Sequence, residues 1–266
     1  MIISASHHQY ESYKNKIQEV RYPSNMLNQI LNYLNNPNHT QTILIEIKSI
    51  EGMEQLEKIT LNMLIKLYNE NPQIKLSFCN LSDLKSFSEK VEDHRYMYAY
   101  PVNTWAFAEV LCCMGVSDIF LGEPLVFEMN AAKALKDKYN INIRVCPHIG
   151  SPTYGLGITN ELNHFFILPH HMKLYKDIVD IIDIRDRNVL REATLIDLYS
   201  KEKEYTLPLN LLVENIKSDA PGSYITKDLA KKRMNCKQNC LRPDRICHSC
   251  DMYIRALNTL KNHSES

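Results

Sequence analysis

Four cysteines near the end of the chain are the residues whose spacing most directly suggests chemistry. They are separated by three, six and two residues, and the set is Cys236, Cys240, Cys247 and Cys250. Each short gap lets two sulfurs point at one ion, as tetrahedral thiolate ligation of zinc requires. Four thiolates also hold iron–sulfur clusters, including the [4Fe–4S] type. The spacing therefore predicts a metal site and leaves zinc and iron–sulfur both open.

The surroundings of these cysteines favour a ligand site over unliganded surface thiols. Half of the eight cysteines of the chain lie in this one segment, and Lys237, Arg242 and Arg245 flank them. Nearby cations lower the pKa of a thiol and so favour the thiolate that binds metal. His248 lies in the same segment and is an alternative ligand.

A basic stretch overlaps the cysteine segment. Residues 227–245 hold seven lysines and arginines against two aspartates, and Lys231, Lys232 and Arg233 are consecutive. Such a stretch can contact a phosphate backbone, or it can be a solvated surface beside the metal site. The sequence leaves both interpretations open.

The elements that position these groups follow a regular rhythm from residue 42 onward. Short β-branched stretches alternate with amphipathic segments whose apolar residues recur every three or four positions, the pattern of strands and helices in βαβ units. The predicted strands are 42–48, 74–79, 96–100, 118–122, 142–146, 165–168 and 180–184.

Seven such units in about 160 residues exceed the usual doubly wound sheet, so the predicted fold is a (β/α) barrel, with an irregular or incomplete barrel also compatible. An eighth strand could come from the N-terminal region or from 205–212. The competing architecture is a doubly wound parallel sheet. We expect an N-terminal helical segment over 1–40, the barrel over 41–205, and a cysteine-cluster extension packed on the barrel over 206–266.

Chemistry in parallel α/β folds takes place at the carboxyl ends of the strands. Three residues there, or within a strand, are the predicted catalytic set: Glu123 as base or ligand, Arg144 within its strand, and His148 as acid–base or anion contact. Their structural alternatives are an acid before a helix, a paired charge and a solvated loop histidine. Other polar residues at predicted strand ends include Glu46, Lys48, Asn80, Tyr100, Asn103, His170, Arg185 and Asp186.

Composition excludes several classes of protein. The 266 residues carry 31 basic and 31 acidic side chains, which excludes a strongly basic nucleic-acid binder as a description of the whole chain. Apolar residues make up 44%, enough for a core. We see no segment long and apolar enough to span a membrane and no targeting pattern after Met1, so we expect a cytoplasmic protein with reduced thiols.

One segment resembles a known family. The stretch from Met114 through Gly115, Asp118 and Gly122 to Glu123 resembles the step from helix to strand in peptidase U32-type barrels, and Asn142–Val145 resembles their next strand. The resemblance covers about residues 96 to 190. It implies a (β/α) barrel, a four-cysteine iron–sulfur site, and a role in RNA or cofactor hydroxylation.

Two functions follow from these observations. The first is an enzyme that uses Glu123, Arg144 and His148 on a small-molecule or RNA substrate at the barrel mouth, with the cysteine cluster as a redox or structural site. The second is a non-catalytic, zinc-stabilised binding protein whose basic C-terminal segment contacts a protein or nucleic acid. The sequence does not choose the substrate or the oligomeric state.

Overall fold

The computed structural model describes residues 1–48, 55–122, 125–147, 167, 169–185, 188–201, 207–208 and 224–225. Eight parallel strands form a closed barrel in chain order, with the last strand paired to the first. The fold is therefore the predicted (β/α) barrel, and its closure excludes the doubly wound sheet, which is open at both edges. The strands are β1 (Ile2–Ser6), β2 (Glu19–Pro23), β3 (Thr42–Ile47), β4 (Ile74–Phe78), β5 (Tyr96–Tyr98), β6 (Asp118–Leu121), β7 (Asn142–Val145) and β8 (Ile181–Asp183).

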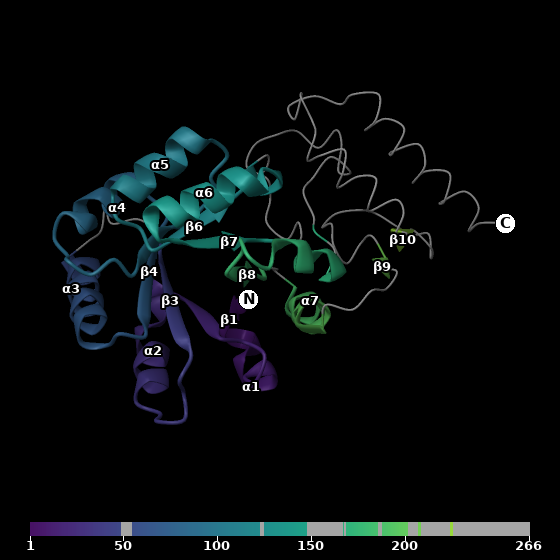
Figure 1. Cartoon of the computed structure of the whole chain (residues 1–266). Helices are drawn as coiled ribbons and strands as arrows, with labels where there is room; N and C mark the ends of the chain where they lie inside the picture. Colours follow the sequence, from purple (N-terminus) through teal and green to yellow (C-terminus); the bar gives the residue numbers. More distant parts are fainter. Residues whose placement is uncertain are drawn as a thin grey trace. The chain divides into compact units, whose positions relative to one another are not determined.

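Helical segments connect successive strands, and Figure 1 shows α2 to α6 outside the strands. They are η1 (His7–Gln9), α1 (Tyr10–Tyr13), η2 (Ser24–Met26), α2 (Leu27–Leu34), α3 (Gln55–Glu70), α4 (Leu81–Ser88), α5 (Trp105–Cys113), η3 (Leu125–Phe127) and α6 (Met129–Tyr139). The N-caps of α4 and α5 are Asn80 and Thr104, whose side chains accept a backbone N–H of the first turn.

Alternation along each strand separates two kinds of buried surface. The outward positions are aliphatic or aromatic and pack the core between strands and helices, as Ile43, Ile45 and Ile47 do on β3. The inward positions of several strands are instead polar or charged, as Glu19 and Arg21 are on β2. The main apolar core thus lies outside the barrel wall.

The barrel begins earlier than the sequence predicts. Residues 1–40 do contain helices, but β1 and β2 also lie there, so the segment is not the separate helical region we expected. The two inward charges of β2 interrupt its apolar pattern, and this concealed the strand. The expected strand 165–168 is not a strand of the barrel, because β7 pairs directly with β8, and of its residues only Ile167 is described. The expected boundary at 205/206 lies outside the described residues, as does the extension 206–266 apart from 207–208 and 224–225.

The chain divides into two compact units, and the barrel belongs to the first, Met1–Val145 with Asp177–Asp183. The second unit holds η5 (Pro169–Tyr175), α7 (Val189–Lys201) and a two-stranded antiparallel pair, β9 (Leu207–Pro208) with β10 (Tyr224–Ile225). Within it the buried Tyr199 hydroxyl donates to the carbonyls of Ile167, at 2.6 Å, and Pro147, at 3.2 Å.

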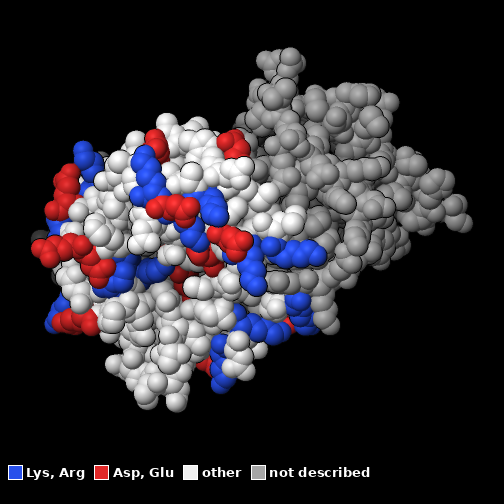
Figure 2. Space-filling model, in the orientation of Figure 1, with Lys and Arg blue, Asp and Glu red and all other residues white. Residues whose placement is uncertain are grey.

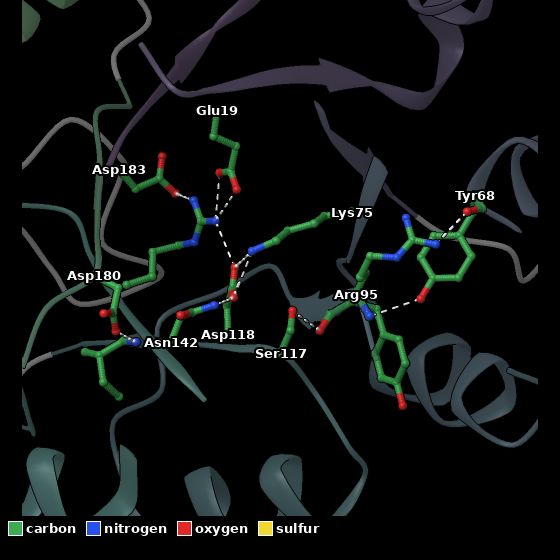
Figure 3. Close-up of polar contacts among 12 residues, drawn as sticks. Glu19, Tyr68, Lys75, Arg95, Ser117, Asp118, Asn142, Asp180 and Asp183 are labelled. Carbon is green, nitrogen blue, oxygen red and sulfur yellow. Dashed lines mark hydrogen bonds and ion pairs between the residues drawn. The ribbon is translucent and has the colours of Figure 1, made fainter. Parts of the chain in front are cut away.

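Arg95, just before β5, binds the chain between the end of α3 and the start of β4. The Arg95 guanidinium donates to the backbone carbonyls of Tyr68, Asn71 and Ile74, each at 2.7 Å, and lies over the Tyr68 ring at 4.3 Å from its centroid. In return the Tyr68 hydroxyl accepts from the Arg95 backbone N–H (Figure 3). This arginine satisfies carbonyls at the end of α3 that the helix itself leaves unpaired.

Two glycines are required by their surroundings. Gly115, just after α5, has φ of +80°, a conformation that side chains rarely adopt. Gly122, at the end of β6, would place an added Cβ against the side chains of Asn103 and Pro101. The loop after β5 therefore lies close against the end of β6 at Gly122.

The described surface carries charges of both signs. Figure 2 shows lysines and arginines interspersed with aspartates and glutamates on the face in view, without a large area of one sign. No helix among the described residues is both long and apolar enough to cross a membrane.

Candidate functional site in the barrel interior

The inward side chains form layers that the strand pairing specifies. In a tilted eight-stranded barrel, alternate strands contribute side chains to the same layer. Followed from the amino to the carboxyl ends of the strands, the registers give three layers of four. They are Glu19, Lys75, Asp118 and Ile181; then Ser4, Leu44, Met97 and Arg144; then Arg21, Ser77, Phe120 and Asp183.

Arg144 lies at the centre of these layers and is completely buried. Its Nη2 is 2.7 and 3.0 Å from the two Glu19 oxygens and 3.1 Å from Asp118 Oδ2. Its Nη1 is 3.3 Å from Asp183 Oδ2. One guanidinium on β7 therefore bridges carboxylates from β2, β6 and β8 (Figure 3).

Two further cations extend the network. Lys75 Nζ is 3.0 Å from both oxygens of Asp118, and Asn142 Nδ2 donates to Asp118 Oδ1 at 2.8 Å. On the opposite side, Arg21 Nη1 is 3.1 Å from Asp183 Oδ1. We call this set the interior ionic network: Glu19, Arg21, Lys75, Asp118, Asn142, Arg144 and Asp183. It pairs three carboxylates with three cations, so its charges balance.

The pKa values reflect this pairing. Burial opposes ionisation of Asp118, but Lys75, Arg144 and the Asn142 hydrogen bond outweigh burial and lower the pKa of Asp118 below its ordinary value. Burial likewise disfavours the Arg144 cation, yet Glu19, Asp183 and Asp118 together raise the pKa of Arg144. Both groups are therefore ionised in the folded protein at neutral pH.

Such a network is an unusual way to fill a barrel. The interior layers of (β/α) barrels are dominated by bulky aliphatic side chains. Desolvating several ions costs about as much as their mutual attraction returns, and well-packed apolar residues of the same volume are often as stable or more stable. Fold stability alone thus gives no reason for the network.

The next layer toward the carboxyl ends of the strands holds short or polar side chains. In the barrel unit its members are Ser6 on β1, Glu46 on β3 and Ala99, which follows β5. Glu46 is half-buried and pairs in register with Ser77. A carboxylate here lies directly above the ionic network, at the end of the barrel where (β/α) enzymes bind substrate.

The predicted catalytic residues have different outcomes. Arg144 is completely buried and is paired within the network, as one of our two alternatives supposed, and a catalytic role for it stays a prediction. Glu123 and His148 lie outside the described residues, and their roles stay predictions. Glu46, named only as a strand-end residue, lies on the inward face.

Several functional candidates escaped the sequence analysis. Glu19 and Asp183 belong to no motif, and Asp118 appeared only in the stretch that resembles U32-type barrels. In the sequence Glu19 lies 125 residues from Arg144, Asp183 lies 39 residues away and Asp118 lies 26 residues away. The available signal was a charge at an inward position of an otherwise apolar strand, which Arg144 itself displayed. A charge at an inward strand position identifies the buried charged residue but not the residues with which it forms ion pairs.

The predicted metal ligands Cys236, Cys240, Cys247 and Cys250 lie outside the described residues, as does the basic stretch 227–245. Among the described residues no group of three or more His, Cys, Asp and Glu side chains is arranged to hold a metal ion. The zinc and iron–sulfur interpretations both stay predictions.

Comparisons with known proteins found no family model, no curated protein and no solved structure that matches this chain. The resemblance to U32-type barrels accordingly stays a prediction from the sequence.

Proposed function

We propose that the chain is a (β/α)-barrel enzyme that binds a small polar substrate at the carboxyl ends of its strands. The observation that supports this proposal is the interior ionic network, which replaces aliphatic layers with paired charges that do little for stability. Perturbed, fully buried ionisable groups concentrate at functional sites because catalysis requires fixed charges and fixed orientations.

In this proposal the network is the floor of the site, and the acid–base groups lie above it. Glu46 is the described residue best placed for proton transfer, because it faces inward one layer nearer the mouth than the network. Glu123 and His148, which follow β6 and β7 in the sequence, are the additional candidates. Arg144 keeps the floor rigid and holds Asp183, and through it Arg21, in one orientation.

We further propose that the four clustered cysteines hold an iron–sulfur cluster or a zinc ion. Four thiolates suit either, and the group would supply electron transfer in the first case and structural cross-linking in the second. An RNA substrate, which the U32 resemblance implies, belongs to the same proposal as the alternative to a small molecule.

Oxygen-free purification followed by elemental analysis and a visible spectrum tests the metal site. Iron with sulfide and a visible band, both lost in Cys236→Ala, supports the cluster, whereas one zinc per chain without a band supports the structural ion. Metal-free protein from an oxygen-free preparation would refute the metal site.

The metal-replete protein is then incubated with small-molecule pools and with total RNA, and substrate loss is followed by mass spectrometry. We expect Glu46→Gln, which keeps the shape and removes the proton-transfer group, to slow turnover by about 10²- to 10⁴-fold. The matched control Glu70→Gln changes an exposed glutamate on α3 and should leave turnover intact. Equal turnover by Glu46→Gln would remove Glu46 from the mechanism.

A further inference from the structure

Two serine hydroxyls inside the barrel stand apart from the ionic network. Ser4 and Ser77 are both completely buried, and neither hydroxyl has a hydrogen-bond partner among the described residues. Buried hydroxyls are nearly always hydrogen-bonded, because leaving one unpaired costs about 1–3 kcal/mol. Each of these serines therefore calls for a partner that the described residues do not supply.

The two serines occupy different depths. Ser4 belongs to the layer of Arg144 and is flanked in register by Glu19 and Asp183. Ser77 lies one layer nearer the mouth, with Arg21, Phe120 and Asp183 in its own layer. Of the two buried serines, Ser77 is therefore the one nearer the mouth.

The layer above Ser77 holds short side chains on two of its strands. Its members on β1 and after β5 are Ser6 and Ala99, two of the smallest side chains, and Glu46 is the register partner of Ser77 on β3. Leu or Phe in place of Ser6 or Ala99 would fill the space above Ser77. The surroundings of Ser77 thus combine a hydroxyl, a carboxylate and the Phe120 ring.

The charge balance of the floor indicates what kind of group fits. Arg21 and Asp183 pair with each other at 3.1 Å, and the network as a whole joins three carboxylates to three cations. An anionic ligand group brought against this floor would lose its hydration and would face the Glu46 carboxylate. A neutral hydroxyl loses far less, and it can both donate to and accept from Ser77.

We propose that the barrel interior binds a neutral, hydroxyl-rich small molecule, a sugar or polyol, one hydroxyl of which hydrogen-bonds to Ser77. The Phe120 ring offers an apolar surface to the C–H groups of such a ligand, and Glu46 accepts from a second hydroxyl. This inference specifies the substrate class of the proposed enzyme and so rests on the proposed function, although binding is measured without turnover.

The test is a binding titration on the full-length, metal-replete protein. The neutral probes are myo-inositol, D-ribose and D-glucose at millimolar concentrations, and the charged counterpart is the anion D-gluconate. Thermal shift and calorimetry give the readouts. We expect at least one neutral probe to raise Tm and bind, D-gluconate to bind at least tenfold more weakly, and Ser77→Ala to weaken binding about tenfold.

Ser4→Ala is the matched control, because it removes an equally buried hydroxyl one layer deeper. It should leave the affinity for the neutral probe unchanged. Both variants should fold, and without ligand neither should be less stable than the wild type, since neither hydroxyl bonds to the described protein. A ligand-free loss of stability in Ser77→Ala would show that a protein group or a resident water already satisfies Ser77, and would overturn the inference.

Three binding outcomes also overturn it: no neutral probe binds, D-gluconate binds more tightly, or Ser77→Ala binds as well as the wild type. The result separates cleanly from the proposed function. Binding that depends on Ser77 without any turnover would preserve the site and refute the enzyme. Turnover that depends on Glu46 without polyol binding would do the reverse.

Discussion

Replacing Arg144 by methionine tests the central claim about the barrel interior. The methionine side chain fills most of the volume but removes a guanidinium that contacts three carboxylates at once. Asp118 keeps Lys75 and Asn142, and Asp183 keeps Arg21. Glu19 is left without the bidentate contact that Arg144 makes to it.

The expected loss of stability follows from the contacts that each carboxylate keeps or loses. Removing one partner of a buried ion pair costs about 3–5 kcal/mol, because the other charge stays buried without compensation. In a chain of this size that corresponds to a fall in Tm of about 6–20 °C. The double variant Arg144→Met/Glu19→Gln removes the stranded charge as well, so it should recover part of the loss despite carrying one more substitution.

The pH dependence has a definite sign. In the wild type the pKa of Asp118 is lowered by folding, so its contribution is present above the unfolded-state pKa and disappears as the pH falls through the folded-state pKa. Acidification therefore destabilises the wild type. In Arg144→Met the deficit relative to the wild type should narrow as the pH falls, because protonation neutralises the carboxylates that the arginine no longer pairs.

The assay is denaturant unfolding followed by tryptophan fluorescence at several pH values. Trp105 is the single tryptophan of the chain and lies on α5 in the barrel unit, so its signal reports on the barrel. Lys66→Met, which breaks an exposed ion pair on α3, is the control and should change little. An Arg144→Met protein as stable as the wild type, at every pH, would refute the argument from buried charge.

Three other substitutions test separate parts of the barrel, each by the same unfolding assay. Arg95→Ala removes three hydrogen bonds to backbone carbonyls and the contact with the Tyr68 ring, and should lower the free energy of unfolding by about 2–4 kcal/mol. Arg95→Lys should not restore this loss, because lysine lacks the planar guanidinium. Gly122→Ala should destabilise the fold by about 1–3 kcal/mol, because the added Cβ meets the Asn103 side chain. The double variant Gly122→Ala/Asn103→Ala should recover part of this stability. A Gly122→Ala protein as stable as the wild type would contradict the close approach of Asn103 to Gly122. Lys75→Met should destabilise the fold most near neutral pH, because it removes one of the cations paired with Asp118. An unchanged decrease of stability at acid pH would show that Lys75 does not lower the pKa of Asp118.

The fold class could be predicted because the outward strand positions dominate the pattern. Strands near 42, 74, 96, 118, 142 and 181 were all predicted and are all present, since their β-branched and aromatic residues pack against helices. The first two strands were not predicted as such. In β2 the inward positions hold Glu19 and Arg21, so the alternation of apolar and charged residues resembles a solvated segment.

What the sequence by itself determined is local. It specified the alternation of strands and helices, the cysteine spacing, and the fact that a charge within strand 142–146 must be paired or face the mouth. These follow from side-chain chemistry and from periods of two and 3.6 residues.

Only the tertiary structure decided which charges meet. Closing the sheet brings β8 beside β1, and the stagger of the strands sets Glu19, Asp118 and Asp183 around Arg144 across separations of up to 125 residues. No local pattern encodes such a meeting, because it depends on barrel closure and register. The same closure buries Ser4 and Ser77 inside the barrel, where their hydroxyls lack a protein partner among the described residues.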